Sequence, residues 1–152
     1  MSEREPKISR ELTVVPRAKA PRISATVAAS IVVPAIVADA GDHAARRFLE
    51  FFAATIRNKN TRMAYYRAAG NFFAWLEQHD IVELVDIEPI HVAAYIETLQ
   101  ATHSKPTAKQ HLAAVRMLFD WLVVGQVLAT NPAHAVRGPK LSLNAGRQGQ
   151  GT

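Results

Sequence analysis

Four consecutive segments between Asp42 and about Val124 carry apolar side chains at intervals of three and four residues. That spacing puts the apolar residues of each segment on one face of an α-helix, whereas a half-buried strand would alternate apolar and polar residues. The predicted helices cover residues 42–56, 61–79, 89–100 and 104–124. Because each helix has one apolar face to bury, the pattern predicts an all-α bundle.

Residues that favour helix boundaries stand at the ends of these segments. Asp42 and Asn60 occupy the positions expected for the N-caps of the first two helices, and Pro89 suits the first turn of the third. Gly125 follows the fourth helix, as glycine commonly does. Beyond it, an Asn131-Pro132 turn predicts a short closing element that covers the end of the bundle.

The same spacing identifies the side chains that should face inward. Two tyrosines, Tyr65 and Tyr66, are adjacent in the second predicted helix. Tyr65 shares the register of Ala69 and Phe72 and is expected to pack inward. Tyr66 is then left at the edge of the apolar face, where its hydroxyl could contact a phosphate group of a ligand. The expected core consists of Phe48, Phe51, Phe52, Tyr65, Ala69, Phe72, Leu76, Val92, Ile96, Leu99, Leu112, Val115, Phe119 and Leu122.

The two ends of the chain lack helical periodicity. Residues 1–41 contain Pro6, Pro16, Pro21 and Pro34 among small and β-branched residues, so we expect a largely irregular N-terminal arm. Residues 138–152 are rich in glycine, glutamine, serine and basic residues, which is typical of a linker or loose tail. The sequence therefore predicts one domain, at 42–137, between an arm and a tail.

The arm also contains an apolar run that could be mistaken for a targeting segment. Residues 23–38 follow a basic stretch, as in a signal peptide, but the leading region is over twenty residues long and contains Glu3, Glu5 and Glu11, and Pro34 interrupts the run. The run is too short to cross a bilayer. We therefore expect a cytoplasmic protein with no membrane partner.

Composition excludes several kinds of site. The chain has no cysteine, so disulfide scaffolds and cysteine-based zinc sites are ruled out. The six histidines are scattered, and none forms the paired pattern of a metalloprotease helix. We expect neither a metal site nor a cofactor.

Charge is distributed unevenly along a chain of formal net charge +5. Residues 57–67 carry four cations and no acid, whereas residues 77–97 carry six carboxylates and no lysine or arginine. The cationic stretch opens a predicted helix, where free backbone N–H groups and the helix dipole already favour an anion. This combination predicts contact with phosphate, and nucleic-acid backbone is the first candidate.

Three sequence blocks occur in a characteristic order: FLEFFAATIRNKNTRMAYYRAAGNFFAWL, then IEPIHVAAYIETL, then SKPTAKQHLAAVRMLFDWLVVGQVLATNPAHAVRGPK. Together they resemble the core-binding domain of tyrosine recombinases of the phage-integrase type. The resemblance covers about two thirds of the chain. It implies a SAM-like bundle of four to five helices that clamps the duplex DNA of a recombination site in DNA integration and site-specific recombination of a mobile element. It also implies other recombinase protomers as further partners.

The resemblance also implies which residues face DNA, at the starts of the second and fourth helices. Many relatives carry arginine where this chain has Gln110 and His111, a difference that weakens the expected grip on a major groove. Arg116 could alternatively pair with Asp120, four residues further along the helix. The implied DNA-binding residues are Lys59, Thr61, Arg62, Tyr66, Lys105, Thr107, Lys109, Gln110, His111 and Arg116.

Family chemistry requires a nucleophilic tyrosine and an arginine-rich phosphate site in a separate catalytic domain. The tyrosines here, Tyr65, Tyr66 and Tyr95, all lie in predicted bundle helices, so we expect no catalytic residue and no enzymatic activity of this chain itself. Three interpretations stay open: a fragment or decayed gene of an integrase, a stand-alone module that regulates an intact recombinase, or a helical protein-interaction domain that uses its acidic face.

Overall fold

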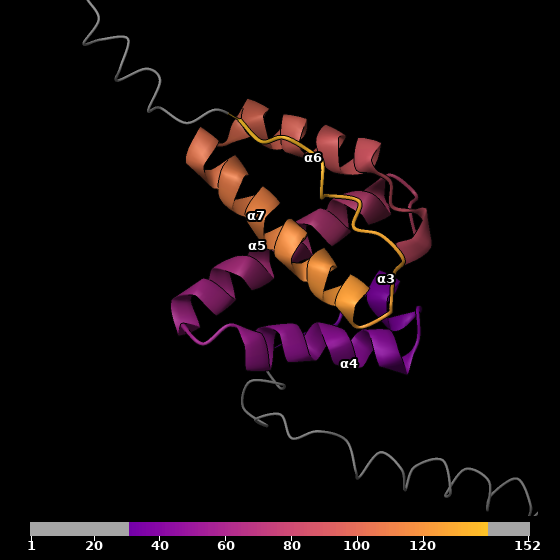
Figure 1. Cartoon of the computed structure of the whole chain (residues 1–152). Coiled ribbons are helices and arrows are strands. Elements are labelled where there is room, and N and C mark those ends of the chain that lie inside the picture. The colour runs from indigo at the N-terminus through magenta and orange to yellow at the C-terminus, as the bar shows by residue number, and fades with distance from the viewer. Residues whose placement is uncertain (1–30, 140–152) are drawn as a thin grey trace, which may run out of the picture.

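The computed structural model describes residues 31–139, and within this range the regular secondary structure is entirely helical (Figure 1). The predicted all-α fold class is therefore confirmed. The elements in chain order are α3 (Ala35–Ala38), α4 (Asp42–Glu50), the π-helical turn η2 (Phe51–Thr55), α5 (Lys59–Gln78), the 3-10 turn η3 (Leu84–Asp86), α6 (Pro89–Thr102) and α7 (Lys105–Val124).

The two longest helices, α5 and α7, cross and form the most extensive helix–helix contact of the bundle. In Figure 1, α4 lies along the lower edge and α6 along the upper edge, with the crossing between them. Both outer helices also contact α7. The crossing pair therefore positions the rest of the domain.

Phenylalanine side chains fill the centre of this arrangement. All six phenylalanines of the chain are buried. The ring of Phe72 lies 5.1 Å from that of Tyr95 and 6.2 Å from that of Phe119, so α5, α6 and α7 meet around it. Every residue of the predicted core is buried except Tyr65, which is half-buried against the core.

Two of the predicted helix caps are wrong. The N-cap of α4 is Gly41, whose φ of 116° favours glycine, and Asp42 is the first helical residue. The N-cap of α5 is Asn58 rather than Asn60, because the Asn58 side chain accepts a hydrogen bond from the Thr61 backbone N–H at 2.9 Å. The predicted start of α7 is confirmed, with Ser104 capping the N–H of Thr107.

The first predicted helix does not continue regularly to Ile56. The α-helix ends at Glu50, and Phe51–Thr55 form one π-helical turn. Phe51 and Phe52 are both buried in this turn, with their rings edge to face and 4.9 Å apart. The turn redirects the chain into α5.

The expectation that helix is absent before Asp42 is wrong at Ala35–Ala38. Pro34 has a φ of −60° and stands at the N-cap of α3, so this proline starts a helix instead of interrupting one. Ile31, Ile36 and Val37 are buried, and α3 packs against α4. The rest of the predicted arm, residues 1–30, and residues 140–152 of the predicted tail lie outside the described residues.

The closing element after α7 is fastened by two side chains. The Asn131 side-chain amide donates to the Arg116 carbonyl at 3.0 Å and to the Asp120 carboxylate at 2.7 Å. The Arg116 guanidinium donates to the carbonyls of Ala133, at 3.1 Å, and Val136. The alternative pairing of Arg116 with Asp120 is therefore wrong. The Asp120 carboxylate accepts a hydrogen bond from Asn131, and the Arg116 guanidinium donates to the carbonyls of Ala133 and Val136.

Candidate nucleic-acid interface

Four exposed cations stand at the starts of the crossing helices: Arg57 and Lys59 at α5, and Lys105 and Lys109 at α7. Lys105 and Lys109 are one helical turn apart and therefore share a face of α7. Figure 1 shows that α5 and α7 begin on the same side of the molecule, at the left of the view. We call these four residues the basic face.

Carboxylates are absent from this part of the sequence. None occurs between Glu50 and Glu77, or between Glu97 and Asp120. The one salt bridge within residues 31–139 joins Arg47 to Glu50, so no carboxylate of that range neutralises the basic face. The acidic connector at residues 80–88 lies on the opposite side of the molecule in Figure 1.

Arg62, a predicted DNA contact, is engaged within the protein. Its Nε donates to the Phe52 carbonyl at 2.8 Å, and its Nη2 donates to the Ile56 carbonyl at 2.9 Å. These carbonyls belong to the π-helical turn and to the residue that follows it. Arg62 therefore stabilises the bend between α4 and α5, where backbone carbonyls at the end of a helix lack partners within the helix.

Tyr66 is engaged in the same way. Its hydroxyl accepts a hydrogen bond from the Val32 backbone N–H at 2.8 Å and donates to the Val32 carbonyl at 3.3 Å. Its ring packs edge to face against Phe52, with centroids 5.6 Å apart. In this structure the hydroxyl thus faces the segment before α3 instead of pointing outward from the basic face.

The other predicted site residues fall into two groups. Lys59, Thr61, Lys105, Lys109 and Gln110 are exposed at the starts of α5 and α7. Thr107 and His111 are half-buried, like Arg62, Tyr66 and Arg116. The Thr107 hydroxyl accepts a hydrogen bond from the Ser104 hydroxyl at 2.9 Å and so belongs to the helix cap. Sequence reasoning omitted Arg57, although it begins the acid-free cationic stretch.

His111 lies beside buried Tyr95, with its Nδ1 3.2 Å from the phenol oxygen. Burial, and then the neighbouring His103, lower the pKa of His111 below its ordinary value of 6.5. Burial also raises the pKa of Tyr95 to about 12. Both groups are therefore neutral near pH 7, and His111 contributes a polar contact without a positive charge.

This geometry predicts a pH dependence of stability. Because the pKa of His111 is lower in the folded protein, the unfolded chain binds more protons, and the free energy of unfolding should fall as the pH decreases through about 6.5. The variant His111→Gln should show a smaller decrease between about pH 7.5 and pH 5.5 in urea titrations. Equal decreases for the two proteins would contradict this role of His111.

Two further features are absent from residues 31–139. No group of three or more histidine, aspartate and glutamate side chains in that range could hold a metal ion. None of the helices there is long and apolar enough to cross a membrane.

Comparison with known protein families assigns the bundle to one of them. The family of phage integrase N-terminal SAM-like domains matches residues 45–125, which is more than half of the 152-residue chain. The chain therefore belongs to that family, as the resemblance of its sequence blocks predicted. The match includes most of α4 and all of η2, α5, η3, α6 and α7, and it ends at Gly125.

Individual relatives carry recombinase names. The chain is 31% identical to a tyrosine recombinase XerC from Xylella fastidiosa over 87 residues, which are 55% of this chain and 29% of the relative. It is 27% identical to a tyrosine recombinase from Pseudothermotoga lettingae over 85 residues, or 54% and 29% of the two chains. A XerC from Chlamydia muridarum is 39% identical over 46 residues, or 30% and 15%.

The chain thus spans less than a third of the length of these curated relatives. The family match is to an N-terminal SAM-like domain. No solved structure matches the chain.

Proposed function

We propose that this chain is a DNA-binding module of a tyrosine recombinase, which holds one side of a recombination-site duplex through the basic face. Lys59, Lys105, Lys109 and Arg57 contact phosphates, while Thr61 and Gln110 add polar contacts beside them. Phosphate contacts of this kind supply affinity and register, whereas base contacts supply sequence specificity.

The observation that supports this proposal is that cations stand at the starts of both crossing helices and that no carboxylate of residues 31–139 neutralises them. Each helix start adds backbone N–H groups and the positive end of the helix dipole. Because α5 and α7 pack directly on each other, the two helix starts have a fixed relative position. A rigid pair of cationic helix ends is suited to a duplex backbone.

Arg62, Tyr66 and Arg116 act in this proposal as supports of the DNA-binding surface. Their hydrogen bonds join α5 to η2 and to the segment before α3, and join α7 to the closing element. Thr107 and His111 likewise shape the start of α7. The proposal keeps these five residues near the DNA and assigns direct phosphate contact to the exposed cations.

The module binds DNA in the cytoplasm together with other recombinase protomers and carries no catalytic residue of its own. DNA cleavage and rejoining belong, in this proposal, to the catalytic domain of an intact recombinase. A stand-alone regulator that occupies recombination sites is the alternative. DNA binding that competes with an intact recombinase would favour the alternative.

The salt dependence of DNA binding tests the proposal. Four or five phosphate contacts release counterions, so the logarithm of the association constant should fall with the logarithm of salt concentration with a slope near −4. Mobility-shift titrations on duplex DNA at several salt concentrations measure this slope. Absence of salt-sensitive binding would refute the proposal, and salt-resistant binding to a protein partner would point to an interaction domain instead.

A further inference from the structure

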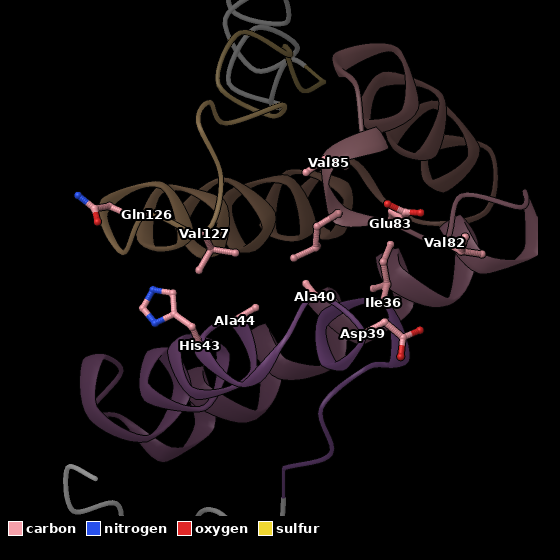
Figure 2. Close-up of a pocket in the computed structure, with 11 residues that line it drawn as sticks. Ile36, Asp39, Ala40, His43, Ala44, Val82, Glu83, Val85, Gln126 and Val127 are labelled. Carbon is pink, nitrogen blue, oxygen red and sulfur yellow. The ribbon is translucent and has the colours of Figure 1, made fainter. Parts of the chain in front are cut away.

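A groove of about 580 Å³, lined by both apolar and polar side chains, lies between α3 and α4 on one side and the connector before α6 on the other. Figure 2 shows Ile36, Ala40 and Ala44 along one wall, and Val85 and Val127 facing them. His43 and Gln126 stand at one end, and Asp39 and Glu83 stand toward the other. The groove is thus apolar along its walls and acidic at one end.

A second groove of about 290 Å³ continues from the first, because Ile36, Asp39 and Val82 line both. It extends between the segment before α3 and the outer side of α5, and it reaches Val32 and Tyr66. The combined groove therefore begins where the chain enters the described structure and ends at the turn after α7.

The charged side chains that line the combined groove are acidic. Asp39, Glu77 and Glu83 line it, and no lysine or arginine of residues 31–139 does. The carboxylates of Asp39 and Glu83 form no salt bridge or hydrogen bond with any residue of the range 31–139. Two valines at the groove, Val82 and Val85, are 56% and 73% exposed. An apolar segment with positive charges would fit this surface.

The chain contains such a segment. Residues 12–22, LTVVPRAKAPR, combine Leu12, Val14 and Val15 with three cations and no acid. Residues 23–30 connect this segment to Ile31, and eight extended residues span at most about 27 Å. That reach covers much of a domain of about a hundred residues, whose radius of gyration is about 13 Å.

We propose that residues 12–22 dock intramolecularly in this combined groove. The valines of the segment cover Val82 and Val85, while Arg17, Lys19 and Arg22 pair with the carboxylates of the lining. Tyr66, hydrogen-bonded to Val32, directs the chain into the groove. The proposal is independent of DNA binding, since the groove contains none of the four cations of the basic face.

A spin label on the N-terminal arm tests this docking in the full chain without DNA. The chain lacks cysteine, so Ala20→Cys provides a single attachment site. Paramagnetic broadening of NMR signals should be strong at Val82, Val85 and Val127, and weak at Lys105 and Lys109. The double variant Asp39→Lys/Glu83→Lys should reduce the broadening rates at the groove about tenfold, because like charges then face each other.

Reversing the partner charges supplies the matched rescue. Arg17→Glu/Lys19→Glu, combined with the groove variant, should restore the broadening, and thermal unfolding checks that both variants remain folded. If the NMR signals of the groove residues stay sharp in the spin-labelled protein that carries only the Ala20→Cys substitution, the proposal is overturned. Broadening in a mixture of spin-labelled and separately isotope-labelled chains would show docking between two copies, and broadening that arises only at α5 with DNA present would assign the arm to DNA. Either result also overturns the proposal.

Discussion

Replacing Arg62 by alanine is expected to lower the free energy of unfolding by about 2–3 kcal/mol, since hydrogen bonds to charged groups contribute about 1.5–3 kcal/mol and their loss leaves partly buried carbonyls unpaired. The Arg62 guanidinium donates to the carbonyls of Phe52 and Ile56, at 2.8 and 2.9 Å. In a domain of this size the midpoint of thermal unfolding should fall by about 10 °C or more. Urea and thermal unfolding of the two proteins measure the difference.

Arg67→Ala is the matched control for this experiment. Arg67 lies on the same helix and is exposed, so its removal should change the free energy of unfolding by less than about 0.5 kcal/mol. Arg62→Lys should recover only part of the lost stability, because an ammonium group lacks the planar fork that reaches both carbonyls. An Arg62→Ala protein as stable as the Arg67→Ala protein would contradict the structural role of Arg62.

Replacing Lys59, Lys105 and Lys109 together by glutamine is expected to weaken duplex binding by about two orders of magnitude near 0.1 M salt. The log–log salt slope should become shallower by about three, one unit for each lost phosphate contact. The three side chains are exposed, so stability should change little. Mobility-shift titrations and urea unfolding of the same preparation measure the two effects separately.

The six lysines of the chain provide a charge-matched control. Lys7, Lys19 and Lys140 lie outside residues 31–139, and their replacement by glutamine changes the net charge by the same amount. This control should retain most of the affinity for duplex DNA. Equal losses in the two triple variants would show that affinity follows net charge instead of the basic face.

The two experiments distinguish a structural role from a DNA-binding role for cations that look alike in the sequence. Arg62 and Lys59 are cations in the same helical turn, and sequence reasoning gave both a DNA contact. In the structure Lys59 is exposed, whereas Arg62 bonds the turn that precedes its helix. The sequence predicts the charge and the helical position of both residues. It does not predict the π-helical turn whose carbonyl accepts a hydrogen bond from Arg62.

Much of the fold could be predicted because helical periodicity is a local property. The inward positions of α6 and α7 follow directly from the spacing of Val92, Ile96, Leu112 and Phe119, all of which are buried. Helix starts were less predictable, since several residues near 58–61 can cap a helix and the choice depends on how η2 ends. The short helix α3 escaped prediction because Pro34 can either interrupt a helix or begin one.

The sequence by itself determined the helical class, the buried faces and the separation of cations at 57–67 from carboxylates at 77–97, because these depend on residue type and spacing along the chain. Only the tertiary structure decided which polar side chains remain available. Arg62, Tyr66 and Arg116 each bond backbone groups that are distant in sequence or in irregular turns, and no local pattern encodes such partners. The basic face consists of the cations at the starts of α5 and α7 that this internal hydrogen bonding leaves exposed.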